Sequence, residues 1–488
     1  MEFEFFGYHG INNGRYQIDG VWHDNGGKSF YDLEHFQDYV NCGLNIMFLQ
    51  ACEYGYDFIV DNGYIKDASA VMQFYTDKES DYQDSLLKQL LDLAKQAGAE
   101  KTLFMDARLY WLSSRTHSLI GNEFQSEKEL DTFVSECVKD YSTHDVFWGL
   151  LLRDEPTWDM FEASGQVFRS LVRVCKKVQP VQNLLPIYGT GTVGSRNLYV
   201  KEMTNADGSE KLRKEFYLEY LTKWIEATDA HYIMFDTYPF RDNGIQRYHT
   251  DGLKYTAEFC KEKNLEFWVV AQSASWGYKG VESVANRAQL KEDMYWQLNM
   301  LMGFGVSKMM YYTYFRRAGC NSTTGGYYHD NASFVNSSGE KTPLYYQAKD
   351  IMSEMQKFAD TILNFKYQGS AIYTQNPTFS DSHRYCLDGN KNDTFTKIKN
   401  VVIGDGNMAM VNELYNDEQQ RYIYMVLNAL DPVNLGKGDT TLSAEVEFDE
   451  KYSRVAVYYK GEVCYEELDG HKYSCKLIPG DAVFLIPC

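Results

Sequence analysis

Eight short apolar runs, alternating with longer amphipathic segments from the N-terminus to the region of Lys349, constrain the fold of this 488-residue chain more than any other feature. Apolar runs that are each followed by a helix-like segment are typical of parallel strands buried on both faces. Eight such units fit a closed (β/α)8 TIM barrel better than an open sheet. No glycine-rich phosphate loop follows the first run, which disfavours a dinucleotide-binding fold. The predicted strands are Phe3–Gly10, Leu44–Ala51, Lys101–Leu109, Val146–Pro156, Asn183–Gly189, His231–Phe240, Leu265–Ser273 and Ser307–Phe315.

The segments between these runs have apolar residues every three or four positions, which predicts amphipathic helices. After the last of them, the pattern changes to short alternating runs separated by turn residues, which is typical of an antiparallel β-sandwich. We therefore predict an α/β chain of two domains, a catalytic barrel over residues 1–365 and a smaller all-β sandwich over residues 366–488. The predicted helices are Ser85–Ala97, Glu127–Lys139, Met160–Lys177, Lys214–Thr228, Ala285–Met302 and Lys349–Phe365.

Charge and composition exclude several classes of protein. Lys plus Arg number 48 and Asp plus Glu number 68, a formal net charge of −20 that disfavours nucleic acid as a partner.

No apolar run reaches the roughly 18 residues of a membrane span, and the start lacks the basic and apolar regions of a secretory signal, so we expect no membrane association and a cytoplasmic location. The ten cysteines are scattered singly, without zinc spacing. Nothing in the sequence predicts the oligomeric state.

The most informative stretch is WGLLLRDEPTW, in the fourth run. It brings Asp154 and Glu155 to the C-terminal end of a predicted barrel strand, where barrel enzymes build their sites. Pro156 ends the strand because it has no N–H for the ladder. Two neighbouring carboxylates in a poorly solvated mouth repel each other, so we expect one pKa to rise towards neutrality, as an acid that protonates a glycosidic oxygen requires. The alternative is a structural carboxylate that caps the next helix or pairs with Arg153.

A second carboxylate is expected from another strand end, and Asp236 in MFDTYPF is the preferred candidate. Asp106 and Glu53 also follow runs, but a structural role is at least as good an interpretation of both. Aromatic residues form 15% of the chain, and those gathered at strand ends, Tyr8 among them, suit the apolar faces of sugars. The predicted substrate-binding residues are Asp106, Arg108, Tyr238, Gln272, Trp276, Tyr312, Tyr314, His9 and Glu53.

Other chemistries lack their signatures. The histidines are isolated, without an HxH pair or an HExxH motif, and no GxSxG elbow is present. We therefore expect neither a catalytic metal nor Ser-His-Asp hydrolysis. Hydrolysis by paired carboxylates needs no cofactor, so none is expected.

The GLLLRDEP run, and the stretch from NRAQLKEDMYWQLNMLMGFGVSKMMYYTYFRR into NSSGEKTPLYYQAKDIMSEMQ, resemble (β/α)8 glycoside hydrolases of the clan A kind. The resemblance is greatest to β-galactosidase-like and related uncharacterised "DEP" hydrolases, which also carry a C-terminal β-sandwich. It covers essentially the whole chain but depends on a few segments. In that clan an acid/base glutamate ends the fourth strand, usually after Asn. The resemblance therefore assigns Glu155, after Asp154, as the proton donor.

The clan's nucleophile, a glutamate ending the seventh strand, corresponds to about Gln272 here. A glutamine amide cannot form a glycosyl ester, so three interpretations stay open. Asp236 or another carboxylate is the base of an inverting hydrolase or a relocated nucleophile. Alternatively, Asp154 and Glu155 act as the Asp-Glu pair of a substrate-assisted N-acetylhexosaminidase. In the third, the barrel binds glycans without turnover.

The function expected from these features is a glycosidase that removes a terminal sugar from an oligosaccharide or glycoconjugate. Glu155 is the general acid, Asp236 the base or nucleophile, and Asp154 orients the substrate or tunes the pKa of Glu155. A metal-dependent barrel hydrolase is the further alternative.

Overall fold

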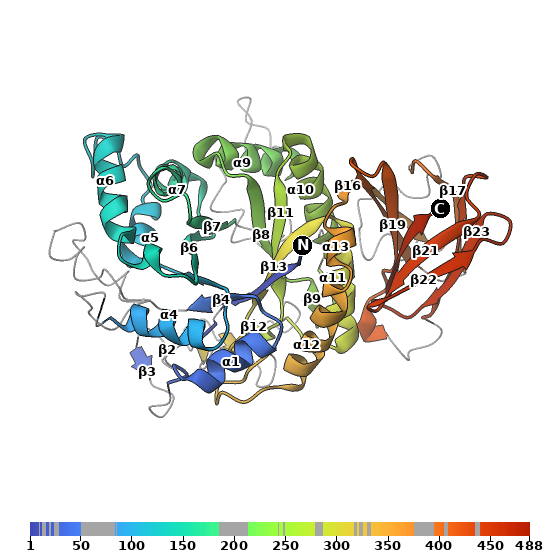
Figure 1. Cartoon of the computed structure of the whole chain (residues 1–488), viewed down its shortest axis with the longest axis horizontal. Helices are drawn as coiled ribbons and strands as arrows, with labels where there is room; N and C mark the ends of the chain where they lie inside the picture. Colours follow the sequence, from blue (N-terminus) through green and yellow to red (C-terminus); the bar gives the residue numbers. More distant parts are fainter. Residues whose placement is uncertain are drawn as a thin grey trace.

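The computed structural model describes the chain except residues 9, 12–15, 19–20, 24–28, 50–82, 84, 185–212, 243, 247–248, 279–285, 317–319, 322–325, 329–332, 375–394, 405–407 and 435–439. The described residues form a parallel barrel surrounded by helices, with an antiparallel β-sandwich beside it (Figure 1). The predicted fold class, a TIM barrel followed by a smaller all-β sandwich, is confirmed.

The barrel consists of eight parallel strands in the order β7-β6-β5-β4-β1-β13-β11-β8. A bridge between Leu184 and Phe235 closes the ring from β7 to β8, and the Leu184 N–H donates to the Met234 carbonyl at 2.8 Å. The closure brings the C-terminal ends of all eight strands to one mouth. Their bounds are β1 Glu4–Tyr8, β4 Ile46–Leu49, β5 Lys101–Phe104, β6 Phe147–Asp154, β7 Gln179–Asn183, β8 Tyr232–Thr237, β11 Glu266–Gln272 and β13 Val306–Tyr312.

The fifth barrel strand differs from the prediction. The sequence predicted Asn183–Gly189, whereas β7 is the more polar segment QPVQN, Gln179–Asn183. Its polar groups find partners inside the barrel wall, since Gln182 Nε2 donates to the Arg153 carbonyl at 2.5 Å and the Gln182 N–H donates to the Tyr232 hydroxyl at 2.9 Å. Because the polar groups of β7 have hydrogen-bond partners, the strand needs no apolar run. The hydrophobic pattern therefore placed the strand too far towards the C-terminus of the chain.

Helices cover the outside of the barrel, and several begin where the sequence predicts. Ser85 and Ser126 cap two of them by accepting the backbone N–H of Lys88 and Glu129. The bounds are α1 Leu33–Asn41, α4 Leu86–Gln96, α5 Ala107–Ser113, α6 Glu127–Val138, α7 Phe161–Val174, α9 Arg213–Thr228, α10 His249–Lys263, α11 Lys291–Gly303, α12 Pro343–Gln356 and α13 Ala359–Ile362.

Two helix boundaries were predicted wrongly. Helix α11 begins at Lys291 rather than Ala285, because Asn286 pairs with Trp276 in an extended loop and the Asp293 carboxylate accepts the Leu290 N–H at 2.8 Å. The predicted last helix is two helices, with α12 starting at Pro343, where a proline is tolerated in the first turn.

The sandwich packs two antiparallel sheets face to face. One has the order β16-β18-β19-β24-β21-β22 and the other β17-β20-β23, and a separate apolar cluster that includes Val411, Val426, Val446 and Leu485 lies between them. The bounds are β16 Lys366–Thr374, β17 Ile398–Ile403, β18 Met408–Asn416, β19 Arg421–Asn428, β20 Leu442–Phe448, β21 Arg454–Tyr459, β22 Glu462–Glu467, β23 Lys472–Leu477 and β24 Ala482–Pro487.

Short strands complete the loops of the barrel. They are β2 Tyr16–Ile18, β3 Val21–His23, β9 Phe240–Arg241, β10 Gly244–Ile245, β12 Trp276–Tyr278, β14 Cys320–Asn321 and β15 Gly326–Tyr328.

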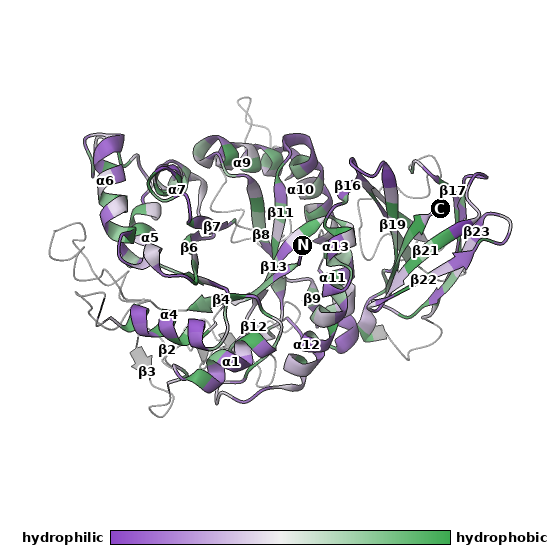
Figure 2. Ribbon diagram, in the orientation of Figure 1, coloured by the Kyte–Doolittle hydropathy of each residue, from purple (hydrophilic) through white to green (hydrophobic). Residues whose placement is uncertain are grey.

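Hydrophobic residues follow the barrel strands and the sandwich strands, while polar residues gather on outer helices such as α4 and α6 (Figure 2). Helix α11 lies where the two parts meet. Trp296 Nε1 donates to the Ala429 carbonyl at 3.3 Å, Asn299 Nδ2 to the Gly480 carbonyl at 3.0 Å, and Asn412 Nδ2 to the Gly303 carbonyl at 2.9 Å. In the described part of the chain, no helix is both long and apolar enough to cross a membrane.

Candidate active site

The C-terminal ends of β6 and β8 bring three carboxyl groups, those of Asp154, Glu155 and Asp236, into one cluster at the barrel mouth. Glu155 leaves β6 with a φ of 47°, a left-handed conformation that costs a non-glycine residue about 1–3 kcal/mol. Its backbone N–H donates to the Asn183 carbonyl at 2.9 Å, which holds this turn against the end of β7. The turn directs the Glu155 side chain towards Asp236, with which it forms a hydrogen bond.

Asp154 accepts hydrogen bonds from two other strands, β1 across the barrel and the adjacent β7. Its Oδ2 accepts from the Tyr8 hydroxyl at 3.1 Å, and its Oδ1 accepts from Asn183 Nδ2 at 2.9 Å. Burial raises the pKa of Asp154, and these two hydrogen bonds oppose the rise because they favour the charged form. Both oxygens of Asp154 therefore accept a hydrogen bond that favours its charged form.

Asp236 is the most deeply buried of the three, with 2% of the residue exposed. Burial raises its pKa well above the ordinary range, and the charges of Glu155 and Asp154 raise it further. In the described part of the chain, no group donates a hydrogen bond to its Oδ1. Burial, and then the charge of Asp154, also raise the pKa of the half-buried Glu155. A hydrogen bond between two carboxyl groups requires one of them to be protonated, and of the two pKa values that of the deeper Asp236 is raised further.

Aromatic side chains form one wall beside these carboxyl groups. The ring centroids of Tyr8 and Tyr312 are 5.7 Å apart, and those of Tyr312 and Tyr238 are 5.4 Å apart. Trp276 completes the group, 5.1 Å from Tyr238 and 5.4 Å from Tyr312. The Tyr238 side chain also hydrogen-bonds to Asp236. The structure thus brings the predicted Tyr238, Trp276 and Tyr312 together with the predicted carboxyl groups.

Asp106 and Arg108, which were predicted as substrate contacts, pair with each other beside α6. Asp106 caps α5, and its two oxygens accept from Arg108 Nε at 3.0 Å and Nη2 at 2.6 Å and from the Tyr141 hydroxyl at 2.8 Å. Arg108 also donates to the Cys137 carbonyl at 2.7 Å. Both side chains are buried against α6, so they form a structural ion pair.

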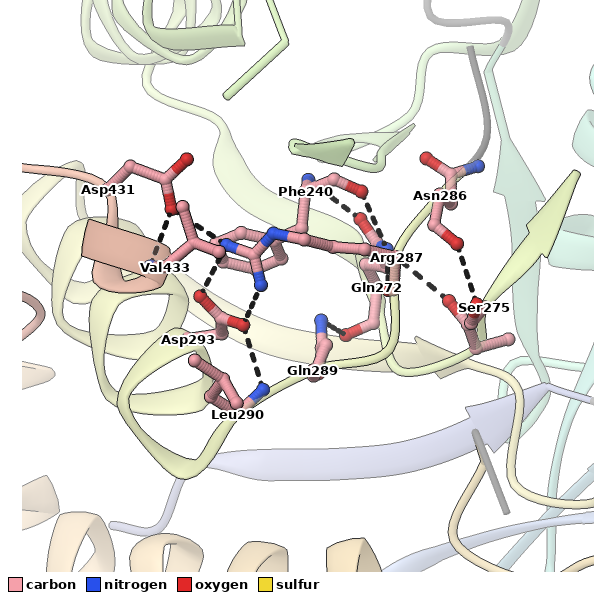
Figure 3. A network of polar contacts seen from close by, with 11 residues as sticks. Phe240, Gln272, Ser275, Asn286, Arg287, Gln289, Leu290, Asp293, Asp431 and Val433 are labelled. Carbon is pink, nitrogen blue, oxygen red and sulfur yellow. Dashed lines mark hydrogen bonds and ion pairs between the residues drawn. The ribbon is translucent and has the colours of Figure 1, made fainter. Parts of the chain in front are cut away.

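Gln272, which was predicted as a sugar contact, is bound by backbone groups of the barrel loops. Its side chain is fully buried, and Oε1 accepts the Phe240 N–H at 2.9 Å while Nε2 faces the Phe240, Ala274 and Arg287 carbonyls at 3.2–3.4 Å (Figure 3). An amide suits this position because it donates and accepts at once. Tyr314, also predicted at the site, is completely buried and packs on Tyr39 with a centroid distance of 4.5 Å.

Two predicted site residues, His9 and Glu53, lie outside the described residues. One site residue was missed: Asn183 was taken as the first residue of the fifth strand, whereas it is the last residue of β7 and therefore faces the mouth. Within the described ranges, no three His, Cys, Asp or Glu side chains form a group that could hold a metal ion.

No family model matches the chain, and no curated protein matches its sequence. Among solved structures, the chain is similar to a family 5 glycoside hydrolase from Bacteroides vulgatus, with 10% identity over 99% of this chain and 88% of the other and a TM-score of 0.47. A GH27 β-L-arabinopyranosidase from Geobacillus stearothermophilus is 8% identical over 100% and 96% of the two chains, with a TM-score of 0.46. A GH30 endoxylanase from Clostridium papyrosolvens is 11% identical over 100% and 97%, with a TM-score of 0.40. At these scores the likenesses carry no argument about the site, whose chemistry follows from its own residues.

Proposed function

We propose that the protein is a glycoside hydrolase that removes a terminal sugar from an oligosaccharide or glycoconjugate. The observation that supports this most directly is the hydrogen-bonded carboxyl pair of Glu155 and Asp236 at the carboxyl ends of the barrel strands. Glycosidic cleavage needs one protonated and one ionised carboxyl group on either side of the scissile bond, and this pair holds one proton. The wall formed by Tyr238, Trp276 and Tyr312 offers apolar faces for a sugar ring.

In the proposed mechanism, Glu155 is the proton donor, since it is the less buried of the two and lies at the edge of the cluster. Substrate binding replaces the hydrogen bond between the carboxyl groups, and the shared proton passes to Glu155 as Asp236 ionises. Glu155 then protonates the glycosidic oxygen while the bond from that oxygen to the anomeric carbon breaks. As a nucleophile, the Asp236 carboxylate attacks the anomeric carbon and forms a glycosyl ester; water, which gives its proton to the now ionised Glu155, then hydrolyses this ester and releases the sugar. As a base, Asp236 instead takes the proton of a water that attacks the anomeric carbon directly.

The direct hydrogen bond bears on which of these two roles Asp236 plays. Retaining enzymes separate their carboxyl groups by about 5–5.5 Å and inverting enzymes by about 6.5–9.5 Å. Glu155 and Asp236 are hydrogen-bonded to each other. A bound sugar therefore has to increase the distance between their carboxyl groups less to reach the separation of a retaining enzyme than that of an inverting one. We therefore favour Asp236 as a relocated nucleophile, in place of the structural Gln272.

Substrate-assisted hydrolysis is the second candidate, and the hydrogen bonds of Asp154 favour it. Donors from Tyr8 and Asn183 on both oxygens favour the charged form that would orient a substrate acetamido group. In this alternative Asp154 and Glu155 suffice, and activity is confined to N-acetyl sugars.

A panel of 4-nitrophenyl and natural glycosides, tested with Glu155→Gln and Asp236→Asn, separates these alternatives. We expect Glu155→Gln to lose several orders of magnitude on natural substrates and much less on activated aryl glycosides, which need little protonation. Relocated nucleophilic catalysis predicts that azide restores turnover to Asp236→Ala and yields a glycosyl azide. Tolerance of Asp236→Asn on N-acetyl sugars supports substrate assistance instead, and saturable sugar binding without product, unaffected by Glu155→Gln, would show that the barrel only binds glycans.

A further inference from the structure

A buried network of charged side chains ties the loop after β11 to the β-sandwich (Figure 3). Arg287 Nη2 donates to Asp431 Oδ1, in the sandwich, at 2.7 Å and to Asp293 Oδ1, in α11, at 2.8 Å. Arg287 Nη1 pairs with the other oxygen of Asp293. Arg287 is 8% exposed, Asp431 2% and Asp293 0%, so none of these groups is a solvated surface charge.

Such a network is a poor way to hold two domains together. Removing three charges from water costs several kcal/mol for each ion, and apolar residues of similar volume usually give equal or greater stability. What a buried ion network does provide is a fixed geometry, because guanidinium and carboxylate groups meet only in a few orientations.

The backbone beside Arg287 holds the loop that carries Trp276. Asn286 and Trp276 exchange two backbone hydrogen bonds, of 2.7 Å and 3.2 Å, and the Arg287 N–H donates to the Phe240 carbonyl at 3.2 Å. The Ser275 hydroxyl donates to the Asn286 carbonyl at 2.7 Å. This segment is therefore fixed from both sides, by Gln272 and Phe240 in the barrel and by Asp431 in the sandwich.

From Trp276 the contacts lead directly to the carboxyl groups. Trp276 lies 5.1 Å from Tyr238 in an edge-to-face arrangement, and the Tyr238 side chain hydrogen-bonds to Asp236. A shift of Trp276 would therefore move both the aromatic wall and a hydrogen-bond partner of Asp236.

We propose that Asp431 of the β-sandwich and Arg287 are positioning residues for the active site, which set the place of Trp276 against Tyr238. The sandwich is then a part of the active-site scaffold rather than an appended module. This inference depends on the proposed function in one respect, since Trp276 is taken to contact the sugar.

The experiment compares Asp431→Asn with Asn412→Ala in the full chain. Asn412 is a matched control, because it too is a buried sandwich residue whose side chain bonds to the barrel, but its bond is to the Gly303 carbonyl at the end of α11 rather than to Arg287. Quenching of tryptophan fluorescence by acrylamide is measured for each variant, with and without the additional substitution Trp276→Phe. The difference between the two measurements gives the contribution of Trp276. Circular dichroism and thermal unfolding show whether each variant is folded. Where Asp431→Asn does not fold, Arg287→Lys replaces it, since lysine keeps the charge but not the two-pronged geometry.

We expect Trp276 to become more accessible to acrylamide in Asp431→Asn and to stay unchanged in Asn412→Ala. On the aryl glycoside that the unaltered protein hydrolyses fastest, kcat/KM should fall about tenfold to a hundredfold only in Asp431→Asn, as displaced active-site groups cause. Equal quenching in both variants, or no change in Asp431→Asn, overturns the inference. If Trp276 responds as expected in a protein that hydrolyses no aryl glycoside, the positioning holds and the proposed function is wrong.

Discussion

Asn183 hydrogen-bonds to both Asp154 and Glu155. Its side-chain Nδ2 donates to Asp154 Oδ1 at 2.9 Å, and its backbone carbonyl accepts the Glu155 N–H, also at 2.9 Å. One residue at the end of β7 therefore favours the charged form of Asp154 and supports the left-handed turn of Glu155. Its own Oδ1 is buried, and no described residue donates to it.

Asn183→Ala should shift the acid limb of the pH profile of kcat/KM to higher pH. The substitution leaves Asp154 with the Tyr8 hydroxyl only, so burial raises the pKa of Asp154 further and it takes up a proton sooner as the pH falls. The profile is measured on an activated aryl glycoside. Asn122→Ala is the control, because Asn122 is exposed and its side chain bonds only to the Ser118 carbonyl. An acid limb that coincides with that of the unaltered protein would rule out this role for Asn183.

The raised pKa of Asp236 predicts a pH-dependent stability difference from Asp236→Asn. The folded state binds the proton more tightly than the unfolded state, so this carboxyl group contributes stability below its unfolded pKa, about 3.9, and loses the contribution as the pH rises through the folded pKa. The free energy of unfolding of Asp236→Asn relative to the unaltered protein should therefore rise with pH and then level off. Urea unfolding at a series of pH values measures it. A difference that stays flat from acid to neutral pH contradicts a raised pKa.

Asn286→Leu should stabilise the protein. Among the described residues, neither the Nδ2 nor the Oδ1 of Asn286 has a hydrogen-bond partner, although the residue is 1% exposed. An unsatisfied buried polar group costs about 1–3 kcal/mol. Leucine has nearly the same shape. The midpoint of urea unfolding should rise, whereas Asn299→Leu, which removes the bond to the Gly480 carbonyl, should lower it. Equal losses in both variants would show that the Asn286 carboxamide contributes to folding.

Asp106→Asn should affect stability and leave catalysis intact. Breaking a buried pair leaves Arg108 with an uncompensated charge, at a cost of about 3–5 kcal/mol. The folded fraction should nevertheless retain its kcat/KM, because Asp106 is bound to Arg108 and Tyr141 and does not face the mouth. Activity is therefore normalised to the folded fraction measured by circular dichroism. A fall in kcat/KM with unchanged stability would return Asp106 to the sugar site.

Gln272→Glu should not create a nucleophile, although it places a glutamate where the resembling hydrolases have one. The Gln272 amide nitrogen faces three backbone carbonyls, and a carboxylate there would lose those bonds and meet them as an acceptor. We expect a loss of about 1–3 kcal/mol in unfolding free energy and no gain in turnover. Chemical denaturation and aryl glycoside assays measure both. An increase in activity would mean that the loop around Gln272 opens to substrate.

The sequence predicted the barrel because eight buried parallel strands leave a strong hydrophobic pattern, and it predicted Asp154, Glu155 and Asp236 because strand ends of one barrel share one mouth. Asp106 also follows a predicted strand, so its position in the sequence did not distinguish it from the three carboxyl residues of the cluster. The helical segment ARLYWLS directly after it was the available signal, since Asp is favoured as an N-cap.

The hydrophobic pattern could not predict two other features, the polar strand β7 and the ion pair between Arg287 and Asp431. The polar strand QPVQN carries no apolar run, so Asn183 was assigned to the wrong end of its strand. The pairing of Arg287 with Asp431 joins residues far apart in the chain and in different parts of the fold, and nothing in the local sequence of either indicates the other.

The closure of the barrel has a mechanical consequence for the carboxyl pair. β7 and β8 meet through the bridge between Leu184 and Phe235, while Glu155, supported by β7, and Asp236, at the end of β8, stand on opposite sides of this seam. The seam is joined by this isolated bridge, whereas β6 with β7 and β8 with β11 are joined by continuous ladders. The proposed substrate would therefore separate the two carboxyl groups across the least hydrogen-bonded join between β6 and β11.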